Sequence, residues 1–390
     1  VRSGQKGKLT INQGRLPSMG TIDTELSGID LTGFNDNYWI GLSLFHTVFA
    51  LEHNTICETL SSRYPSWTDE QLFQKARLIN AALIAKIHTV EWTPALLQHP
   101  TLDSGMKANW WGLLGEQIRK RIGRLSPSEV WSGIPGSPTD HHTAPYAMTE
   151  EFVAVYRLHP LIPDEYRFYS MTDSAFSRYK SFLDIQGNKT RSTIDELGIE
   201  NVWFSFGVAH PGKLALGNFP HFLQKFRRIK RLPNGDPEII DLAAIDIFRD
   251  RERGVPRYNA FRRMLRMKPI MSFEELNPEW AKKLNDLYMG DVERLDLMVG
   301  LYAEEPPPGF AISDTAFRIF TLMAPRRLKS DRFFTADFRP DVYTPLGIDW
   351  VQNNDLTSLL LRHYPSLAPA LLGLGNAFLP WHNVHEPTHH

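Results

Sequence analysis

The hydrophobic positions along the chain recur mainly at the spacing of an α-helix. Across residues 38–60 the apolar side chains fall three and four positions apart, which predicts one long helix. A second helix is predicted to begin after Thr68, because Thr68 and Gln71 have the spacing of a capping box. Its apolar face continues until Pro94, which is expected to end the helix.

Shorter helices are predicted at several later places: from about residue 242, over 277–288, over 314–323 and within the Leu-rich stretch 356–374. Residues 1–36 are rich in Gly, Thr, Ser, Asn and Asp, so we expect an irregular N-terminal segment there. Residues 375–390 are expected to form a C-terminal tail. The sequence shows no internal repeat and no convincing linker. It therefore predicts a mainly α fold, a single large helical domain over residues 1–390 with very little β-structure.

The charge balance and the cysteine content narrow the classes of partner and compartment. Lys and Arg number 43 and Asp and Glu number 44, so nothing favours a nucleic acid as partner. The single cysteine, Cys57, excludes an internal disulfide and favours an intracellular protein, either soluble or peripheral to a membrane. No apolar run of about 18 residues occurs, so no transmembrane segment is expected. The chain opens at Val1 without a signal-peptide pattern, and we expect it to begin partway through a longer protein.

Residues 149–164 hold the most informative pair of side chains. Tyr156 and His159 lie three residues apart in an apolar run, so on a helix their rings would point into the same interior. Pro160 and Pro163 would then end or bend that helix. The spacing alone is more typical of two ordinary core side chains than of a catalytic pair.

The sequence of this stretch changes that interpretation. EEFVAVYRLHPLIPD at residues 150–164 resembles the proximal helix of the haem peroxidase–cyclooxygenase superfamily, and it looks most like the fatty-acid α-dioxygenases. In that superfamily a histidine ligates haem iron, and in the oxygenase branches a tyrosine three residues earlier carries a radical. The resemblance implies a haem-peroxidase-like domain in which His159 is the proximal ligand of haem b iron and Tyr156 is the catalytic radical site.

A second stretch, IDLAAIDIFRDRERGVPRYN at residues 240–259, is similar to the superfamily helix that supplies the partner of the proximal histidine. It implies that Asp246 bonds the far ring nitrogen of His159, which fixes the tautomer and tunes the metal. Arg249 matches the arginine that pairs with a haem propionate, and an Arg fork suits a carboxylate. Without the resemblance, the charges of residues 249–253 are typical of a solvated helix end.

A third stretch, AKIHTVEWTP at residues 85–94, is similar to the α-dioxygenase segment in which a histidine and a threonine five residues later bind the substrate carboxylate. His88 and Thr93 match these two positions. An apolar channel holds a carboxylate only when hydrogen bonds and opposite charge compensate for the lost water. The resemblance adds a late arginine, within RRLKSDRFFT at residues 326–335. Arg332 is favoured and Arg327 stays open; taken alone, His88 would be an ordinary helix-face histidine.

A fourth stretch, FHTVFALEHN at residues 45–54, matches a superfamily motif with one departure. Peroxidases that oxidise halides or small donors need an arginine where this chain has Leu51, which argues against that activity. We interpret His46, Glu52 and His53 as structural. TLDSGMKANWWGLLG at residues 101–115 is also similar to an α-dioxygenase segment, so the resemblance covers nearly the whole chain.

Two weaker features remain. KFRRIKR at residues 225–231 is basic and could touch anionic lipid, although a solvated helix end is the favoured interpretation. Four histidines near the C-terminus could bind a metal, but a tail without metal is favoured: His382, His385, His389 and His390.

The superfamily's distal histidine and calcium-binding loop precede every stretch matched here. No histidine occurs before His46, and the opening of the chain resembles the segment that follows the calcium loop. One explanation is an N-terminal portion, truncated or separate, that carries the distal histidine and any calcium. The other is a protein without the distal apparatus and with impaired catalysis. We favour the first, because the proximal and substrate-binding stretches are intact.

The resemblance thus implies an enzyme, a haem-dependent fatty-acid α-dioxygenase. Peroxide would oxidise the haem, Tyr156 would carry the radical, and O2 would add at carbon C2 of a long-chain fatty acid to give a 2-hydroperoxy fatty acid. Three alternatives stay open: a cyclooxygenase-like or linoleate-type dioxygenase with the same Tyr and His pair, a non-catalytic haem-binding protein, and a helical protein without haem.

Overall fold

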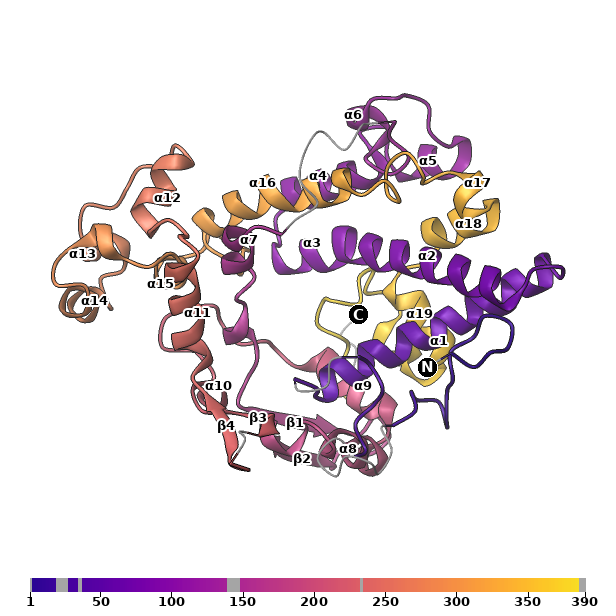
Figure 1. Ribbon diagram of the computed structural model, residues 1–390, viewed down its shortest axis with the longest axis horizontal. Coiled ribbons are helices and arrows are strands. Elements are labelled where there is room, and N and C mark those ends of the chain that lie inside the picture. The colour runs from indigo at the N-terminus through magenta and orange to yellow at the C-terminus, as the bar shows by residue number, and fades with distance from the viewer. Residues whose placement is uncertain (1, 19–26, 34–36, 139–147, 232–233, 386–390) are drawn as a thin grey trace.

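The computed structural model of the protein describes residues 2–18, 27–33, 37–138, 148–231 and 234–385 (Figure 1). Helices hold 54% of the residues and strands 7%, so the predicted mainly α class is confirmed. Two long helices, α1 (Ile40–Arg63) and α2 (Asp69–Ile87), pack against each other, and the other elements lie around them. None of the described helices is long and apolar enough to cross a bilayer.

The second long helix begins where the capping box predicts. The Thr68 hydroxyl oxygen accepts a hydrogen bond from the Gln71 backbone N–H at 3.3 Å, and the Gln71 side chain accepts one from the Thr68 N–H at 2.9 Å. The predicted end at Pro94 is wrong. Five residues of π-helix, here called the π turn (His88–Trp92), follow α2 directly, and α3 (Thr93–Leu96) contains Pro94 in its first turn.

The remaining helices are short. In the first half of the chain they are α4 (Pro100–Trp111), α5 (Glu116–Ile122), α6 (Glu129–Ser132), α7 (Glu150–Val155), α8 (Lys189–Leu197), α9 (Ile199–Val208) and α10 (His221–Gln224). In the second half they are α11 (Leu242–Glu252), α12 (Tyr258–Met264), α13 (Phe273–Leu276), α14 (Ala281–Leu287), α15 (Leu297–Ala303), α16 (Asp314–Ser330), α17 (Pro340–Tyr343), α18 (Pro345–Asn353), α19 (Leu356–His363) and α20 (Ala368–Leu371). Among the described residues, 3-10 turns lie between some of these helices, at His159–Leu161, Phe182–Asp184, Val292–Arg294 and Pro365–Leu367.

The helix predicted through Tyr156 and His159 is shorter than expected. The Thr149 hydroxyl caps α7, but the helix ends at Val155 and Tyr156 is its C-cap residue. His159 opens a separate 3-10 turn, because Pro160 has no N–H to continue an α-helix. The prediction that the two rings share one helix face is therefore wrong.

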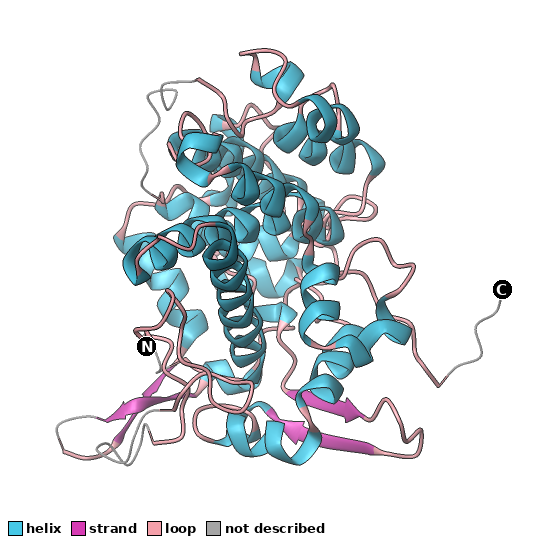
Figure 2. Ribbon diagram, turned by 90° about the vertical axis from the view of Figure 1, so that its right-hand side faces the viewer, coloured by secondary structure: helices cyan, strands magenta, loops and turns pink. Residues whose placement is uncertain are grey.

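In the described part of the chain, two separate antiparallel hairpins lie at the lower end of the molecule in Figure 2, on opposite sides of it. In the first, β1 (Glu165–Tyr169) pairs with β2 (Ser177–Ser181), and β1 buries alternate residues against α9. In the second, β3 (Phe226–Arg231) pairs with β4 (Pro237–Ile240). The helix end predicted at residues 225–231 is thus a strand, because Asn234 and Gly235 sit in the turn that returns the chain to β4.

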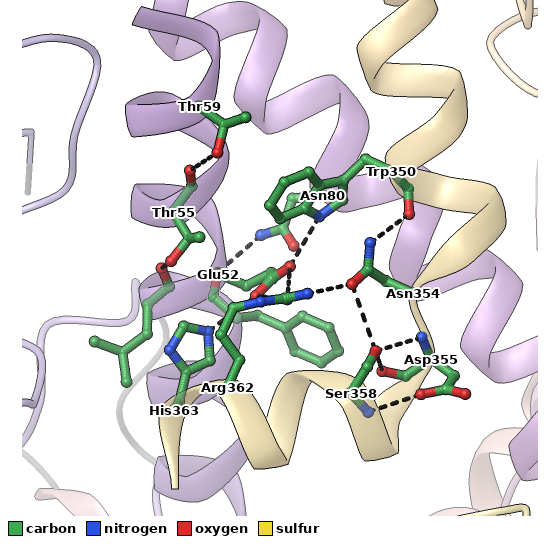
Figure 3. A network of polar contacts seen from close by, with 12 residues as sticks. Glu52, Thr55, Thr59, Asn80, Trp350, Asn354, Asp355, Ser358, Arg362 and His363 are labelled. Carbon is green, nitrogen blue, oxygen red and sulfur yellow. Dashed lines mark hydrogen bonds and ion pairs between the residues drawn. The ribbon is translucent and has the colours of Figure 1, made fainter. Parts of the chain in front are cut away.

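A buried ionic cluster joins α1 to the C-terminal helices (Figure 3). Glu52 is fully buried and accepts hydrogen bonds from Arg362 at 2.6 and 2.7 Å, from His363 at 2.9 Å and from the Trp350 indole at 2.8 Å. His53 also contacts a backbone oxygen, that of Gly7, at 2.9 Å. The side chains of Glu52 and His53 thus bind other parts of the fold, which supports their interpretation as structural residues.

Both ends of the described chain pack onto the helices. Residues 2–18 make isolated bridges, and Asn54 exchanges two hydrogen bonds with the backbone of Leu9. At the C-terminal side, where a tail is expected, Trp381 is buried and its backbone N–H donates to the Gly207 oxygen at 2.8 Å. His385 contacts the Ser170 oxygen at 2.6 Å, whereas His389 and His390 lie outside the described residues. Within the described part of the chain, no group of three His, Cys, Asp or Glu side chains could hold a metal ion.

Candidate active site

One cavity brings together four of the residues singled out in the sequence. It has a volume of about 580 Å³ and is lined by His88, Thr93, Tyr156 and Arg327. These side chains come from the π turn, α3, the C-cap of α7 and the last turn of α16. The rest of the lining is mainly apolar, with Phe320 among it. The cavity therefore combines a small set of polar groups with an apolar wall, as ligand sites usually do.

The π turn sets the relation between the first two of these residues. The Thr93 N–H donates to the His88 oxygen five residues earlier, and the Thr93 hydroxyl donates to the same oxygen at 2.9 Å. A hydrogen bond over five residues stacks residue 93 above residue 88, as the ordinary bond over four residues does in an α-helix. His88 and Thr93 consequently line the same cavity.

The His88 imidazole lies in a site that favours its neutral form. Its ring stacks on Trp92, with ring centroids 4.7 Å apart and planes 22° apart. Burial lowers the pKa of His88 below its ordinary value, although the ring stays accessible to solvent through the open cavity. An anion beside the ring would reverse that shift, because it favours the imidazolium.

The Tyr156 phenol is surrounded by aromatic rings. Its centroid lies 4.7 Å from that of Phe152, 6.1 Å from Phe320 and 6.3 Å from Trp92. Burial raises the pKa of Tyr156, so the phenol keeps its proton at neutral pH. Its hydroxyl has no hydrogen-bond partner among the residues that the structure describes. The O–H group is therefore available to a ligand in the cavity.

His159 lies outside this cavity, beside a buried carboxylate of α11. The His159 Nδ1 atom is 3.2 Å from an oxygen of Asp246, and the Arg157 Nε atom is 3.2 Å from the other oxygen. Asp246 is only 1% exposed. Since the carboxylate faces Nδ1, the second ring nitrogen is the one left to bind a metal, which fits the arrangement expected for a proximal ligand.

Two residues next to this pair were not found from the sequence. Arg157 pairs with Asp246, and its charge also acts on a second buried acid, Asp250, whose oxygens have no hydrogen-bond partner in the described chain. Burial raises the pKa of Asp250 to about 6, and the Arg157 charge opposes that shift. Tyr302 donates to the Arg157 backbone oxygen. The sequence did offer one indication of this cluster, because Arg157 lies only two residues before the predicted haem ligand His159.

Two predicted arginines are bound elsewhere. Arg249 donates to both oxygens of Glu150, at 2.9 and 3.0 Å, and so ties α11 to the start of α7. Arg332 lies beyond the end of α16, is 62% exposed and pairs with Asp337 at 2.7 Å. Of the two arginines left open by the sequence, only Arg327 lines the cavity.

Known proteins with similar sequences and structures agree with the resemblance found in the sequence. Alpha-dioxygenase 2 of Arabidopsis thaliana is 40% identical over 99% of this chain, which spans 62% of that relative. The crystal structure of fatty acid alpha-dioxygenase from Arabidopsis thaliana matches with a TM-score of 0.90 and 39% identity, over 99% of this chain and 61% of its own. That of an Oryza sativa fatty acid alpha-dioxygenase variant with palmitic acid matches with a TM-score of 0.89 and 37% identity, over 97% and 63%.

The predicted likeness to the fatty-acid α-dioxygenases is therefore confirmed. The chain spans slightly over three-fifths of the length of these relatives, 62% in the first case. The family model of the animal haem peroxidases matches residues 1–371. This chain belongs to the animal haem peroxidase family.

Proposed function

We propose that the protein is a haem-dependent dioxygenase that inserts O2 at carbon C2 of long-chain fatty acids to give 2-hydroperoxy fatty acids. The observation that carries the proposal is the single cavity lined by His88, Thr93, Tyr156 and Arg327. Relatives of similar sequence are named alpha-dioxygenases, and one such structure was solved with palmitic acid. Oxygenation at C2 requires a cavity that binds the carboxylate at one end and places a phenol beside the next carbon.

The fatty-acid carboxylate binds at His88, Thr93 and Arg327 in this proposal. A carboxylate that leaves water must find both hydrogen bonds and positive charge, and these three side chains supply them. The bound carboxylate would raise the pKa of His88 from its lowered value, so that His88 becomes protonated and supplies a positive charge beside the carboxylate. The Thr93 hydroxyl would turn from the His88 oxygen towards the ligand.

The haem fits beside His159. An oxygen of Asp246 lies 3.2 Å from the His159 Nδ1 atom, where a hydrogen bond between them would fix the orientation of the imidazole and leave the other ring nitrogen for iron. When bound, haem b supplies the peroxide-driven one-electron oxidation of Tyr156. Arg249 is the proposed partner of a haem propionate, which would replace Glu150 as the acceptor of its two N–H groups.

The chemistry at the substrate belongs to Tyr156. Its phenoxyl oxygen takes one hydrogen atom from C2, which restores the phenol and leaves a carbon radical. O2 adds to that radical, and the resulting peroxyl group regains a hydrogen atom from Tyr156, so the phenoxyl radical is formed again. Holding the carboxylate at one end of the cavity presents one C–H bond to the phenol, which makes the reaction regioselective.

The exchange Tyr156→Phe tests this proposal in haem-loaded protein expressed from its natural reading frame. We expect the Soret band to be kept and the 2-hydroperoxide from palmitate to be lost, as measured by mass spectrometry. Tyr166→Phe is the matched control, because Tyr166 is a buried phenol without a hydrogen-bond partner in the described chain, outside this cavity. A Tyr156→Phe enzyme that still makes 2-hydroperoxide would refute the radical assignment.

The wild-type protein in the same assay separates the remaining functions. Oxygen at a mid-chain carbon would support a cyclooxygenase-like or linoleate-type dioxygenase. A Soret band without oxygenation would support a non-catalytic haem-binding protein. No Soret absorbance would support a helical protein without haem.

A further inference from the structure

The π turn is held by residues far away in the sequence. One oxygen of the Glu91 side chain accepts a hydrogen bond from the Leu356 N–H at 3.1 Å, in the first turn of α19. The Asn376 side chain donates to the Glu91 backbone oxygen at 2.9 Å. Glu91 therefore ties the π turn to α19 through its side chain and to the segment after α20 through its backbone.

The carboxyl group of Glu91 is buried with too few hydrogen bonds to replace the water that it loses. The residue is 6% exposed, and its Oε1 atom is buried without a hydrogen-bond partner in the described chain. A buried carboxylate with one neutral donor has lost more hydration than it regains. The site thus favours the neutral acid over the ion.

Two charged groups act directly on Glu91. Lys86 is buried five residues earlier, and its amine donates to backbone oxygens of residues 352 and 354 at 2.9 and 2.8 Å. Asp355, which caps α19, has the same charge as ionised Glu91. Behind Lys86 lie Glu116 and Lys120 of α5, which form an ion pair at 2.8 Å. Burial raises the pKa of Glu91 to about 7 and lowers the pKa of Lys86 to about 8.

We propose that Glu91 is a positioning residue whose charge controls how tightly the π turn holds a fatty-acid carboxylate at His88 and Thr93. This inference rests on the proposed function, because it takes a carboxylate as the ligand. Glu91 lies three residues after His88 and two before Thr93. An ionised Glu91 and a bound carboxylate would be two negative charges on one helical turn, and the protein between them screens poorly.

The expected pH dependence has a definite sign. Below about pH 7 Glu91 is neutral and binding is tight, whereas at higher pH its charge repels the substrate. We expect the KM for palmitate to rise about threefold to tenfold as Glu91 ionises, because the repulsion between two like charges in one poorly screened site is of that order. In the free protein His88 loses its charge at a lower pH, because burial lowers its pKa from 6.5. A bound carboxylate raises that pKa, so His88 adds a rise in KM that is common to the wild type and to a Glu91 variant.

The exchange Glu91→Gln tests the inference, because the amide keeps a carbonyl oxygen for the Leu356 N–H but does not ionise. The wild-type KM for palmitate should rise through neutral pH more steeply than the KM of the variant, in which only the linkage between His88 and the bound carboxylate remains. Glu116→Gln is the matched control: it removes the same charge from a carboxylate that is 37% exposed, and it should keep the wild-type profile. A purely structural role for Glu91 would change the KM without changing its pH profile.

An uncharged ligand separates charge from shape. Hexadecan-1-ol, used as a competitive inhibitor, should show an inhibition constant that does not vary with pH in either protein. A wild-type rise in KM that persists undiminished in Glu91→Gln would overturn the proposal, and so would an alcohol that follows the palmitate profile. If no 2-hydroperoxide forms, the proposed function fails, while palmitate affinity measured by tryptophan fluorescence still tests the role of Glu91.

Folding of the variant is checked by thermal unfolding against pH. The folded-state pKa of Glu91 exceeds its ordinary value of 4.5, so its ionisation costs stability progressively between about pH 4.5 and 7. Glu91→Gln should abolish that loss. If the variant does not fold, Lys86→Met replaces it, and the KM rise should then move to higher pH because the Lys86 charge lowers the pKa of Glu91.

Discussion

Replacing Arg327 with methionine is the sharpest test of where the substrate carboxylate binds. Arg327 lies in the last turn of α16 and lines the cavity together with His88 and Thr93. Arg332 follows the end of that helix, is 62% exposed and bonds Asp337 at 2.7 Å. The two arginines are five residues apart, yet their surroundings differ enough to predict very different effects.

The magnitudes follow from these surroundings. Removing one partner of a hydrogen-bonded charge pair in a shielded site costs about 2 to 5 kcal/mol. His88 and Thr93 share the carboxylate, so we take the lower end, and about 2 to 3 kcal/mol corresponds to about a 30- to 150-fold rise in KM. Arg332 is exposed and does not line the cavity, and its pair with Asp337 contributes at most about 1 kcal/mol to stability, so Arg332→Met should leave the KM for palmitate nearly unchanged.

Steady-state kinetics with palmitate, and inhibition by hexadecan-1-ol, measure the effect. Arg327→Met should raise the KM for the acid and leave the inhibition constant of the alcohol unchanged, because the alcohol presents no carboxylate. Arg332→Met serves as the control of equal charge. A larger effect at Arg332 would refute the assignment, and equal small effects would show that neither arginine binds the carboxylate.

Two further predictions concern buried carboxylates. Arg362→Met leaves Glu52 buried without its cation and should lower the free energy of unfolding by about 3 to 5 kcal/mol in urea at neutral pH, against at most about 1 for the surface-pair control Arg318→Met. Since its partners depress the pKa of Glu52 below 4.5, the wild-type advantage should exist above about pH 4.5 and shrink as the pH falls further; an unchanged midpoint would contradict this account. Asp246→Asn replaces the anion beside His159 with a neutral amide and should raise the haem reduction potential in a spectroelectrochemical titration, whereas Asp341→Asn, on α17, should not. An unchanged potential would argue against Asp246 as the partner of His159.

The helical class could be predicted because apolar residues recur at helical spacing over long stretches, and the cap at Thr68 follows from local chemistry. The strands could not be predicted in the same way. In β1 the buried residues Tyr166 and Phe168 alternate with exposed ones, but the strand is only five residues long. A pattern that short does not distinguish a hairpin from a loop without its partner β2, which lies eight residues further on.

The choice between Arg327 and Arg332 was made from the resemblance of residues 326–335, and the helix predicted before them ended too early to inform it. The helix was predicted over residues 314–323, two residues short of Pro325. In the structure α16 continues through Pro325 to Ser330. Residues 320, 324 and 327 then recur at helical spacing and line one cavity, whereas Arg332 falls past the end of the helix. The packing around α16 determines where the helix ends, and the local sequence alone does not predict that packing.

His88 and Thr93, five residues apart, line one cavity because of a third residue, Pro94. In a regular α-helix, residues five apart point about 140° away from each other, so this pair could not line one cavity. Pro94 has no N–H for the oxygen four residues earlier, and its ring would crowd that oxygen. The backbone widens instead, and the Thr93 N–H bonds the His88 oxygen. The carboxylate site is therefore encoded by His88, Thr93 and Pro94 together, since without the widened turn the first two would face different parts of the protein.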